Sequence, residues 1–367
     1  MKLKSQKKHI AYFITPHGYG HAARASAVMD AILKLDPEFH FEIFTQVPPW
    51  FFDDSLPVSS FDYHPYPVDV GLVQTNPLQE DLDETVNRLK ELIPFSPDRI
   101  HQLVKILGNT GCQLILCDIS PLGIAVGKAA GLPSILLENF TWDWIYDGYL
   151  KDEPRLLEFI NYLKDVFITT DYHIQTTPVC TPLANADLTT GVIARKPKNS
   201  ISATRTKLGI PQNAKAVLLS MGGFEGHYSF LVRLKSFKNT YFIIPDGSDQ
   251  MRIVENLVLL PHHSSLYHPD LVLTSDLVIG KIGYSTLAET FYSGIPFVYV
   301  IRPDFRESDV LSQFVQREIG GFEILANEFQ NGEWISTLSP WVNRPRKQKP
   351  ENNGADQAAD FIVGLLK

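Results

Sequence analysis

The chain has 367 residues, of which 44% are hydrophobic and 20% are charged, and its formal net charge is −8. This length suits two domains of ordinary size, and the apolar content is enough for packed cores, which excludes a disordered chain. The negative net charge gives no general attraction to nucleic acid, so an anionic ligand must be held by a local site. We expect a globular protein of two domains with no nucleic-acid partner.

Cysteine usage and the amino-terminal residues bear on the compartment. The three cysteines, Cys112, Cys117 and Cys180, lack the spacing of a metal site and predict reduced thiols, with neither a disulfide nor zinc. The first eight residues are basic, but the apolar run after them is too short for a signal peptide, and no stretch approaches the ~20 apolar residues of a membrane span. We expect a cytoplasmic protein without a transmembrane segment, whose basic start is compatible with contact with a membrane surface.

The first half of the chain has the pattern of a parallel sheet covered by helices. A strand over 9–15, a helix over about 22–35 and a strand over 39–45 form the opening unit. After an irregular region over 47–80, we expect helices over 83–92 and 98–107, a strand over 113–117, a helix over 122–130 and a strand over 134–137. Ligands of such sheets bind at the carboxyl ends of the strands, where the loop over 17–21 and Asp118 are expected.

The second half repeats this alternation. The expected strands cover 216–220, 240–244, 257–260, 277–279 and 297–301, and the expected helices begin at Ser285 and cover 356–366. We predict an α/β protein with two facing Rossmann-like, doubly wound domains and a cleft between them. The domains are 1–194 and 206–350, joined by a linker over 195–205, and residues 351–367 form a helix that packs back on the N-terminal domain.

The segment from 276 to 296 is the most informative. A buried strand ends at Gly280, Gly283 allows close approach of a ligand to the backbone, and Ser285 stands where a helix N-cap is expected. Free N–H groups and the dipole at a helix start favour a diphosphate. Glu289 lies on the same helical face as Ser285, where its carboxylate can accept both hydroxyls of a ribose. The alternative is an ordinary turn with a capping serine and a solvated glutamate.

Polar residues also follow two other predicted strands. His21 is expected at the start of the first helix, facing the cleft, with His17 on the opposite side of the turn. An imidazole can take a proton from a sugar hydroxyl near neutral pH when a carboxylate orients it, and Asp118 is the candidate. Gly222 and Gly223 end a strand of the second half, where they either approach the same phosphates or form a tight turn.

A competing pattern occurs in the first loop, because Gly18-Tyr-Gly20-His-Ala-Ala23 satisfies the dinucleotide fingerprint G-x-G-x-x-A. That fingerprint needs an acidic residue at the end of the second strand to bind a ribose. This position reads Thr45-Gln46, which disfavours a nicotinamide dehydrogenase.

With these residues in view, the chain resembles the GT-B nucleotide-sugar glycosyltransferases, in the branch of the bacterial peptidoglycan N-acetylglucosaminyltransferase and the plant UDP-glycosyltransferases. It resembles the glycosyltransferase-like amino-terminal half of plant L-arabinokinase more than it resembles these two groups. The sugar-kinase half that follows in that family is not part of this chain. The matching stretches are 17–24, 139–146, 207–210 with 220–223, and 280–289.

The resemblance implies a role for each matching residue. His21 would be the catalytic base and Asp118 its orienting aspartate, and Glu307 is the nearest match to the residue that meets the donor sugar. Lys281 stands where the plant enzymes have a histidine and is assigned to the donor site. The diphosphate contacts fall on Gly283, Ser285 and Thr286, the ribose contact on Glu289, and the acceptor side on His17, Gly20 and Trp142, the last as an acceptor wall or as packing between domains.

The expected reaction is a single displacement that inverts the anomeric carbon. A helix start that stabilises the departing nucleoside diphosphate needs no metal, so we expect no metal and no cofactor. Retaining members of the fold carry two glutamates eight positions apart, whereas this chain has Phe297 eight residues after Glu289. The expected partners are a nucleotide-sugar donor, preferably a UDP-sugar, and an unidentified acceptor. The alternative function is binding or sensing of a nucleotide sugar without transfer.

Overall fold

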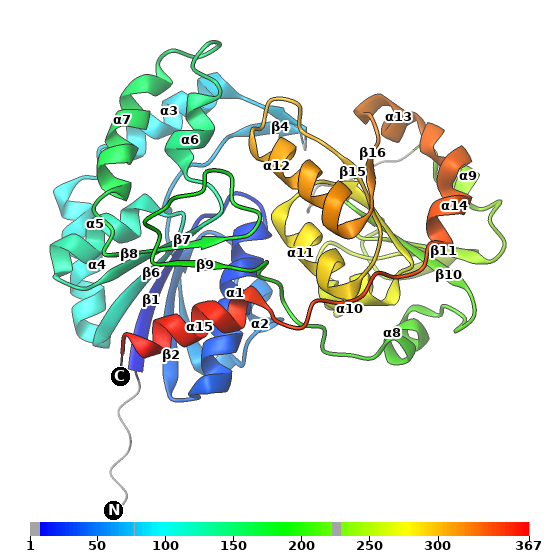
Figure 1. Cartoon of the computed structure of the whole chain (residues 1–367), viewed down its shortest axis with the longest axis horizontal. Coiled ribbons are helices and arrows are strands. Elements are labelled where there is room, and N and C mark those ends of the chain that lie inside the picture. The colour runs from blue at the N-terminus through cyan, green and yellow to red at the C-terminus, as the bar shows by residue number, and fades with distance from the viewer. Residues whose placement is uncertain (1–7, 77, 222–228, 367) are drawn as a thin grey trace, which may run out of the picture.

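The computed structural model describes residues 8–76, 78–221 and 229–366. Two seven-stranded sheets, each with helices on both faces, form two domains that lie side by side (Figure 1). A short two-stranded hairpin is added to the first domain. The predicted class, α/β with two doubly wound domains, is confirmed.

The N-terminal sheet has the strand order β3-β2-β1-β6-β7-β8-β9, and all its strands are parallel. Its strands are β1 (Lys8–Ile14), β2 (Phe39–Thr45), β3 (Phe61–Pro65), β6 (Cys112–Asp118), β7 (Ser134–Glu138), β8 (Tyr172–Thr176) and β9 (Leu188–Thr190), and the hairpin is β4 (Gln74–Asn76) with β5 (Gln79–Glu80). The helices are α1 (Gly20–Leu35), α2 (Trp50–Asp53), η1 (Val58–Ser60), α3 (Leu82–Leu92), α4 (Pro97–Thr110), α5 (Pro121–Ala130), α6 (Trp142–Asp147) and α7 (Leu156–Phe167).

Both faces of this sheet are buried, which explains the nearly continuous apolar runs of its central strands. Ala11 and Phe13 of β1 belong to a core shared with α3, α4, α5 and α7. Ile10 and Tyr12 alternate with them and pack on the opposite face with α1 and α15. The sheet is thus fixed between two layers of helices, with its strand ends free to carry polar residues.

The C-terminal sheet has the strand order β12-β13-β11-β10-β14-β15-β16, in which β12 is antiparallel to β13 and the other pairs are parallel. Its strands are β10 (Lys215–Ser220), β11 (Thr240–Ile244), β12 (Arg252–Val254), β13 (Leu257–Leu259), β14 (Leu277–Lys281), β15 (Phe297–Val300) and β16 (Phe322–Glu323). The helices are α8 (Ile201–Leu208), α9 (Leu231–Leu234), α10 (His268–Thr274), α11 (Tyr284–Ser293), α12 (Glu307–Phe314), η2 (Val315–Ile319), α13 (Ala326–Asn331), η3 (Glu333–Thr337) and α14 (Leu338–Val342).

The chain ends on the domain in which it began. Helix α15 (Gly354–Gly364) packs along α1, as the red and blue helices of Figure 1 show. The Asn353 side chain caps α15 and donates from Nδ2 to the carbonyl of Ala194 at 2.7 Å. The two segments that connect the domains are therefore joined beside the N-terminal sheet.

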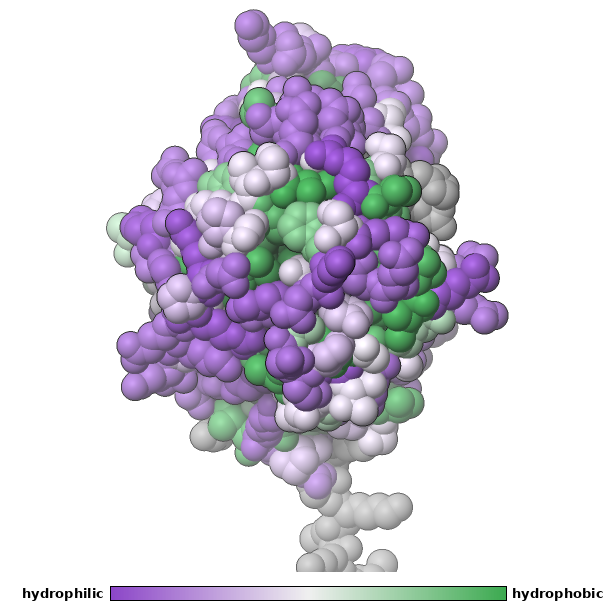
Figure 2. Space-filling view, turned by 90° about the vertical axis from the view of Figure 1, so that its right-hand side faces the viewer, coloured by the Kyte–Doolittle hydropathy of each residue, from purple (hydrophilic) through white to green (hydrophobic). Residues whose placement is uncertain are grey.

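The surface at the C-terminal domain's end of the molecule is mostly hydrophilic, with separate small apolar areas (Figure 2). Among the described residues, no helix combines the length and apolar character that crossing a membrane requires.

Several elements differ from the sequence-based expectation. The region over 47–80 is not irregular throughout, because it contains α2, the edge strand β3 and the β4-β5 hairpin. The segment before the second domain contains β9, and the pattern did not indicate α6, α7 or β8. The helix expected to begin at Ser285 begins one residue earlier, with Gly283 as its N-cap, and Ser285 lies in the first turn.

Candidate functional site

The site forms where helix α1 of the N-terminal domain faces helix α11 of the C-terminal domain. Helices α1 and α11 are in contact, and each begins at the carboxyl edge of its own sheet. His21 lies in the first turn of α1 and is 7% exposed, and Asp118 is the fully buried last residue of β6. Nδ1 of His21 lies 2.7 Å from Oδ1 of Asp118. The structure thus joins the two residues that the sequence placed at neighbouring strand ends.

Arg24, one turn after His21, is part of the same cluster. Its Nε donates to Oδ2 of Asp118 at 2.8 Å and its Nη2 donates to Oδ1 at 2.6 Å. Nη2 also lies 3.1 Å from Nδ1 of His21. Burial by itself raises the pKa of Asp118, but the Arg24 guanidinium and the bond to His21 hold that pKa below its ordinary value. Asp118 is therefore an ionised carboxylate with a fully buried cationic partner.

The cluster continues into the C-terminal domain. Nη1 of Arg24 donates to Oδ1 of Asn139 at 2.5 Å, and Nδ2 of Asn139 donates to Oε1 of Glu307 at 2.7 Å. Glu307 is the first residue of α12 and is 7% exposed. The residue expected to meet the donor sugar is thus connected by hydrogen bonds to the His21–Asp118 pair across the interface between the domains.

Tyr284, at the start of α11, is hydrogen-bonded to the N-terminal domain. Its hydroxyl lies 2.7 Å from Oγ1 of Thr176, accepts from the N–H of Ile193 at 3.0 Å and reaches the carbonyl of Thr177 at 3.0 Å. The Arg24 guanidinium lies over the Tyr284 ring, 5.0 Å from its centre. These contacts set the distance between the start of α11 and His21.

Three cavities adjoin one another around the two helix starts. The central cavity contains His21, Lys281 and Gly283 in its wall. It shares Tyr19, Ser285 and Thr286 with a cavity that we call the nucleoside cavity, and it shares His17, Gly18 and Gln74 with one that we call the outer cavity. The first turn of α11 thus separates the nucleoside cavity from the central one, and the loop before α1 separates the central cavity from the outer one.

The nucleoside cavity is built by both domains and is rich in aromatic side chains. Trp50 of α2 stacks on His263 of the other domain, with ring centres 4.3 Å apart. The Tyr19 hydroxyl lies 3.0 Å from Nε2 of His262. The other residues that line the nucleoside cavity include Phe51, Arg195, Ser220, Met221, Tyr267 and His268. Flat rings beside a few polar groups suit a heterocyclic base and its ribose.

Glu289 differs from both sequence interpretations. It is 2% exposed rather than solvated, and both of its carboxylate oxygens are bonded. Oε1 accepts from Arg195 Nε at 3.1 Å and Nη2 at 2.9 Å, and Oε2 lies 2.6 Å from Nδ1 of His268. Arg195 and His268 line the nucleoside cavity, whereas Glu289 lies behind them. The Glu289 carboxylate thus orients two cavity residues, and its direct contact with a ribose stays a prediction.

Cationic groups gather in the wall of the central cavity. Burial and the nearby Arg302 lower the pKa of Lys281, the last residue of β14, to about 7. Burial and the positive charge of Arg302 also lower the pKa of His17. Arg302 is buried and lies 3.4 Å from Glu80. Burial thus disfavours the charged forms of Lys281 and His17, and an anion beside them would favour those forms.

The outer cavity, of about 710 Å³, lies on the other side of His17 and is open to solvent. Asp69 in its wall is buried, and burial raises the pKa of this carboxyl to about 7 despite bonds from Thr15 and Trp142. Trp142 is 1% exposed and points its Nε1 at Asp69, 3.3 Å away. Trp142 is therefore buried packing and not an open wall of the outer cavity.

Several predicted residues have a less direct place. Gly20 is the first residue of α1 and borders the central cavity, while Gly222 and Gly223 lie outside the described residues.

The sequence contains one Asp-x-Asp pattern of the kind that can hold a divalent metal ion, Asp81-Leu-Asp83. Asp81 caps α3 through the N–H of Glu84 at 2.9 Å, and Asp83 pairs with Arg155 at 2.6 Å. Both carboxylates are thus engaged in contacts away from His21.

Comparison with known proteins agrees with this architecture. No protein-family model matches the chain. The glycosyltransferase of kitacinnamycin superposes with a TM-score of 0.67 at 15% identity, over 98% of this chain and 99% of that one. The calicheamicin glycosyltransferase CalG4 superposes with a TM-score of 0.63 at 13% identity, over 99% of each chain. The chain therefore has the GT-B fold of these glycosyltransferases.

Two curated relatives are recognisable from sequence. L-arabinokinase of Arabidopsis thaliana is 24% identical over 372 residues, an alignment that covers all of this chain but 35% of that protein. An uncharacterized glycosyltransferase of Methanopyrus kandleri is 23% identical over 282 residues, covering 71% of this chain and 78% of that protein. The chain thus spans about a third of the plant protein and most of the archaeal one.

Sequence reasoning missed three functional candidates, Arg24, Arg195 and His268. Arg24 could have been found from the sequence, because it is a charged residue within a helix segment of small, apolar residues. The alternation of strands and helices predicts that this segment is buried. Arg195 lies in a segment whose polar and proline-rich composition indicated a linker. Its contact with Glu289 joins positions 94 residues apart, which no local pattern shows.

Proposed function

We propose that the protein is a glycosyltransferase that moves a sugar from a nucleotide-sugar donor, a UDP-sugar by preference, to an acceptor hydroxyl. The observation that carries the proposal is the order of the cavities. A donor whose nucleoside occupies the nucleoside cavity would have its diphosphate at the start of α11 and its sugar in the central cavity beside His21. The acceptor would then occupy the outer cavity. This order is the one that a transfer between donor and acceptor needs.

The reaction would be a single displacement. The acceptor oxygen forms a bond to the anomeric carbon, the bond from that carbon to the diphosphate oxygen breaks, and the acceptor proton passes to His21. Because Nδ1 of His21 is held by Asp118, Nε2 is the nitrogen that takes the proton. The N–H groups at the start of α11 and the basic side chains of the central cavity stabilise the departing nucleoside diphosphate. Attack from the face opposite the leaving group inverts the anomeric centre, with no metal required and no cofactor beyond the donor.

One observation favours a second function, the binding or sensing of a nucleotide sugar without transfer. Arg24 neutralises Asp118 and lies beside His21, so a proton on His21 would make the three-residue cluster net positive. That charge opposes the base role unless the departing diphosphate compensates it. The donor-side features would serve either function equally.

A donor panel separates the two functions. We expect one class among UDP-, GDP- and dTDP-sugars to raise the melting temperature of the protein and to release nucleoside diphosphate, slowly with water and faster with an acceptor. Binding without release would support the sensing function. A panel in which no nucleotide sugar binds would contradict both. The proposed setting is the cytoplasm, where nucleotide sugars are the donors, with no nucleic-acid partner.

A further inference from the structure

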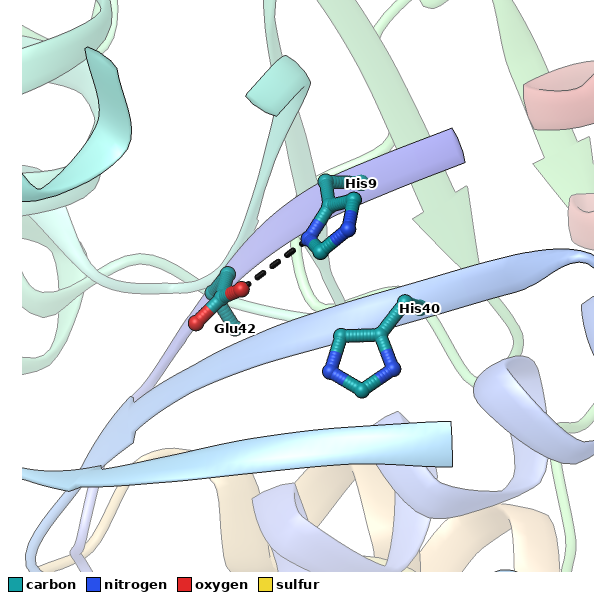
Figure 3. A group of neighbouring side chains, drawn as sticks. All are labelled: His9, His40 and Glu42. Carbon is teal, nitrogen blue, oxygen red and sulfur yellow. Dashed lines mark hydrogen bonds and ion pairs between the residues drawn. The ribbon is translucent and has the colours of Figure 1, made fainter. Parts of the chain in front are cut away.

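A second group of titratable side chains lies on the N-terminal sheet, away from the cleft. His9 is the second residue of β1, and His40 and Glu42 lie on β2, where His40 is the register partner of His9 (Figure 3). Odd positions of β1 and even positions of β2 share one face of the sheet. The catalytic candidates lie at the carboxyl ends of β1 and β6, so the group occupies the other end of the same sheet.

We propose that His9, His40 and Glu42 bind a divalent transition-metal ion of the zinc class. One ligand atom from each residue lies within 4.8 Å of the other two. Zinc ligands lie about 2.0–2.2 Å from the metal, so tetrahedral ligand atoms are roughly 3.3 Å apart. Nδ1 of His9 and Oε1 of Glu42 are already 3.0 Å apart (Figure 3). Small side-chain rotations therefore suffice to bring the three ligands around one ion.

The chemistry of the three ligands favours an ion of this class. Two imidazoles and one carboxylate are the ligand set of many zinc sites and leave a fourth position for water. Hard ions such as Mg²⁺ and Ca²⁺ prefer oxygen ligands throughout. The group therefore suits Zn²⁺, or Co²⁺ as its spectroscopic substitute.

Residues around the group have the arrangement of an outer shell. Metal-bound histidines usually give their second ring N–H to a carboxylate, and Nε2 of His40 lies 2.9 Å from Oδ2 of Asp62 on β3. The second oxygen of Glu42 is held by Nε2 of His64 at 2.7 Å. Asp62 and His64 thus fix the orientations of one imidazole and of the carboxylate.

Burial and charge agree with a cation at this place. The Glu42 side chain is 1% exposed, and its two carboxylate oxygens lie against His9 and His64. The His9 side chain is 21% exposed, which gives an ion a route from solvent. The nearest lysine in sequence, Lys8, is paired with Asp36 at 3.0 Å. An ion at this site would fasten β1 to β2 and, through the outer shell, to β3.

Cobalt and zinc titrations test the proposal on the full chain, freed of any histidine tag and of metal. We expect one Co²⁺ per chain with visible absorption bands, displacement of Co²⁺ by Zn²⁺, and a rise in melting temperature with Zn²⁺. His9→Ala and Glu42→Gln should each abolish the bands and the rise, and Asp62→Asn should weaken binding by about 10–100-fold. His173→Ala is the matched control, because His173 is similarly exposed and pairs with Glu138 on the same sheet.

The outcomes are distinct, and none depends on sugar transfer. Loss of binding in His9→Ala and Glu42→Gln, with retention in His173→Ala and native circular dichroism in all three, supports the site. Wild-type protein without the bands, or bands that survive in both ligand variants, would show that the group is only a network of hydrogen bonds. Since His9 is at the solvent edge, His9→Ala is the variant that tests the site with the least risk to folding.

Discussion

Arg24 gives the His21–Asp118 pair a charge that differs from that of a simple histidine–aspartate pair. Two of its nitrogens hold both oxygens of a carboxylate that has no exposure to solvent. The pair without its arginine would be a buried anion, and the arginine without the pair a buried cation. Position 24 therefore links the stability of the N-terminal domain to the chemistry of the site.

This link predicts a large effect of Arg24→Met. Breaking a buried ion pair by removing one partner costs about 3–5 kcal/mol, because the other charge stays buried and unpaired. Urea denaturation should show that the free energy of unfolding falls by about this amount. The matched control is Arg155→Met, which removes an ion pair at an exposed arginine and should change stability little. An equal effect of both variants would contradict the importance of burial.

Lys281 predicts the pH dependence of donor binding. Burial lowers its pKa to about 7 in the free protein, and an anionic diphosphate nearby favours the charged form. Below pH 7 the lysine is already protonated, whereas above pH 7 binding must take up a proton. The dissociation constant of a nucleotide sugar should therefore rise between pH 7 and 8.5, by at most about tenfold per pH unit.

Calorimetry across this pH range tests the role of Lys281. Lys281→Met should bind more weakly at pH 6.5 and should have a flatter pH profile. A wild-type profile without pH dependence would separate Lys281 from the phosphates, as would an unchanged slope in the variant. Nucleotide sugars are the suitable probe, because their diphosphate is doubly substituted and keeps its charge over this range.

At the scale of elements, the proposed donor site depends on how closely β10 and β14 approach each other. Gly280 pairs with Ser220, and a Cβ atom at position 280 would lie 1.8 Å from the Ser220 carbonyl oxygen. A residue with a Cβ atom therefore does not fit here without separating the two strands. The close packing at the strand end therefore sets where α11 begins.

This close approach predicts that Gly280→Ala is strongly destabilising and weakens donor binding. A matched control is Gly108→Ala in α4, where an added Cβ would meet nothing within 4 Å. Alanine is better than glycine inside a helix by about 0.5–1 kcal/mol, so the control should be neutral or slightly stabilised. Thermal melts of both variants make the comparison, and a Gly280→Ala protein as stable as wild type would contradict the packing argument.

The contacts of Glu289 in α11 predict that this residue also affects donor binding. Glu289→Gln keeps the shape but removes the charge that holds Arg195 and His268 in the wall of the nucleoside cavity. We expect a raised dissociation constant for the nucleotide, measured by calorimetry, with the first turn of α11 intact. A dissociation constant equal to that of the wild type would remove Glu289 and its partners from the donor site.

At the scale of the whole molecule, the sequence predicts the fold better than it predicts the site. Strands such as β6 and β14 are continuous apolar runs between helices, so their periodicity and order indicate the parallel sheets. The edge strand β3 escapes prediction because it is short and a proline ends it. The closing helix was predicted from the amphipathic pattern of the terminal stretch, and α15 lies along α1.

The site is predictable only where local pattern and strand ends carry it. His21 and Asp118 come together because both stand at the carboxyl edge of one sheet, which topology alone brings into contact. The partners of Glu289 and the contact of Asn139 with Glu307 arise from packing between domains, over separations of up to 168 residues. Such contacts depend on side-chain geometry that a linear pattern does not contain.

The central claim, that His21 transfers the acceptor proton, is tested most directly by His21→Gln assayed for both turnover and binding. The account predicts that release of nucleoside diphosphate falls by about a hundredfold or more, as expected when a general base is lost, while the donor dissociation constant stays within about twofold. The matched control, His173→Gln, changes a histidine paired with Glu138 on the same sheet and should keep most of the turnover. Full activity of His21→Gln with a native dissociation constant would contradict the account.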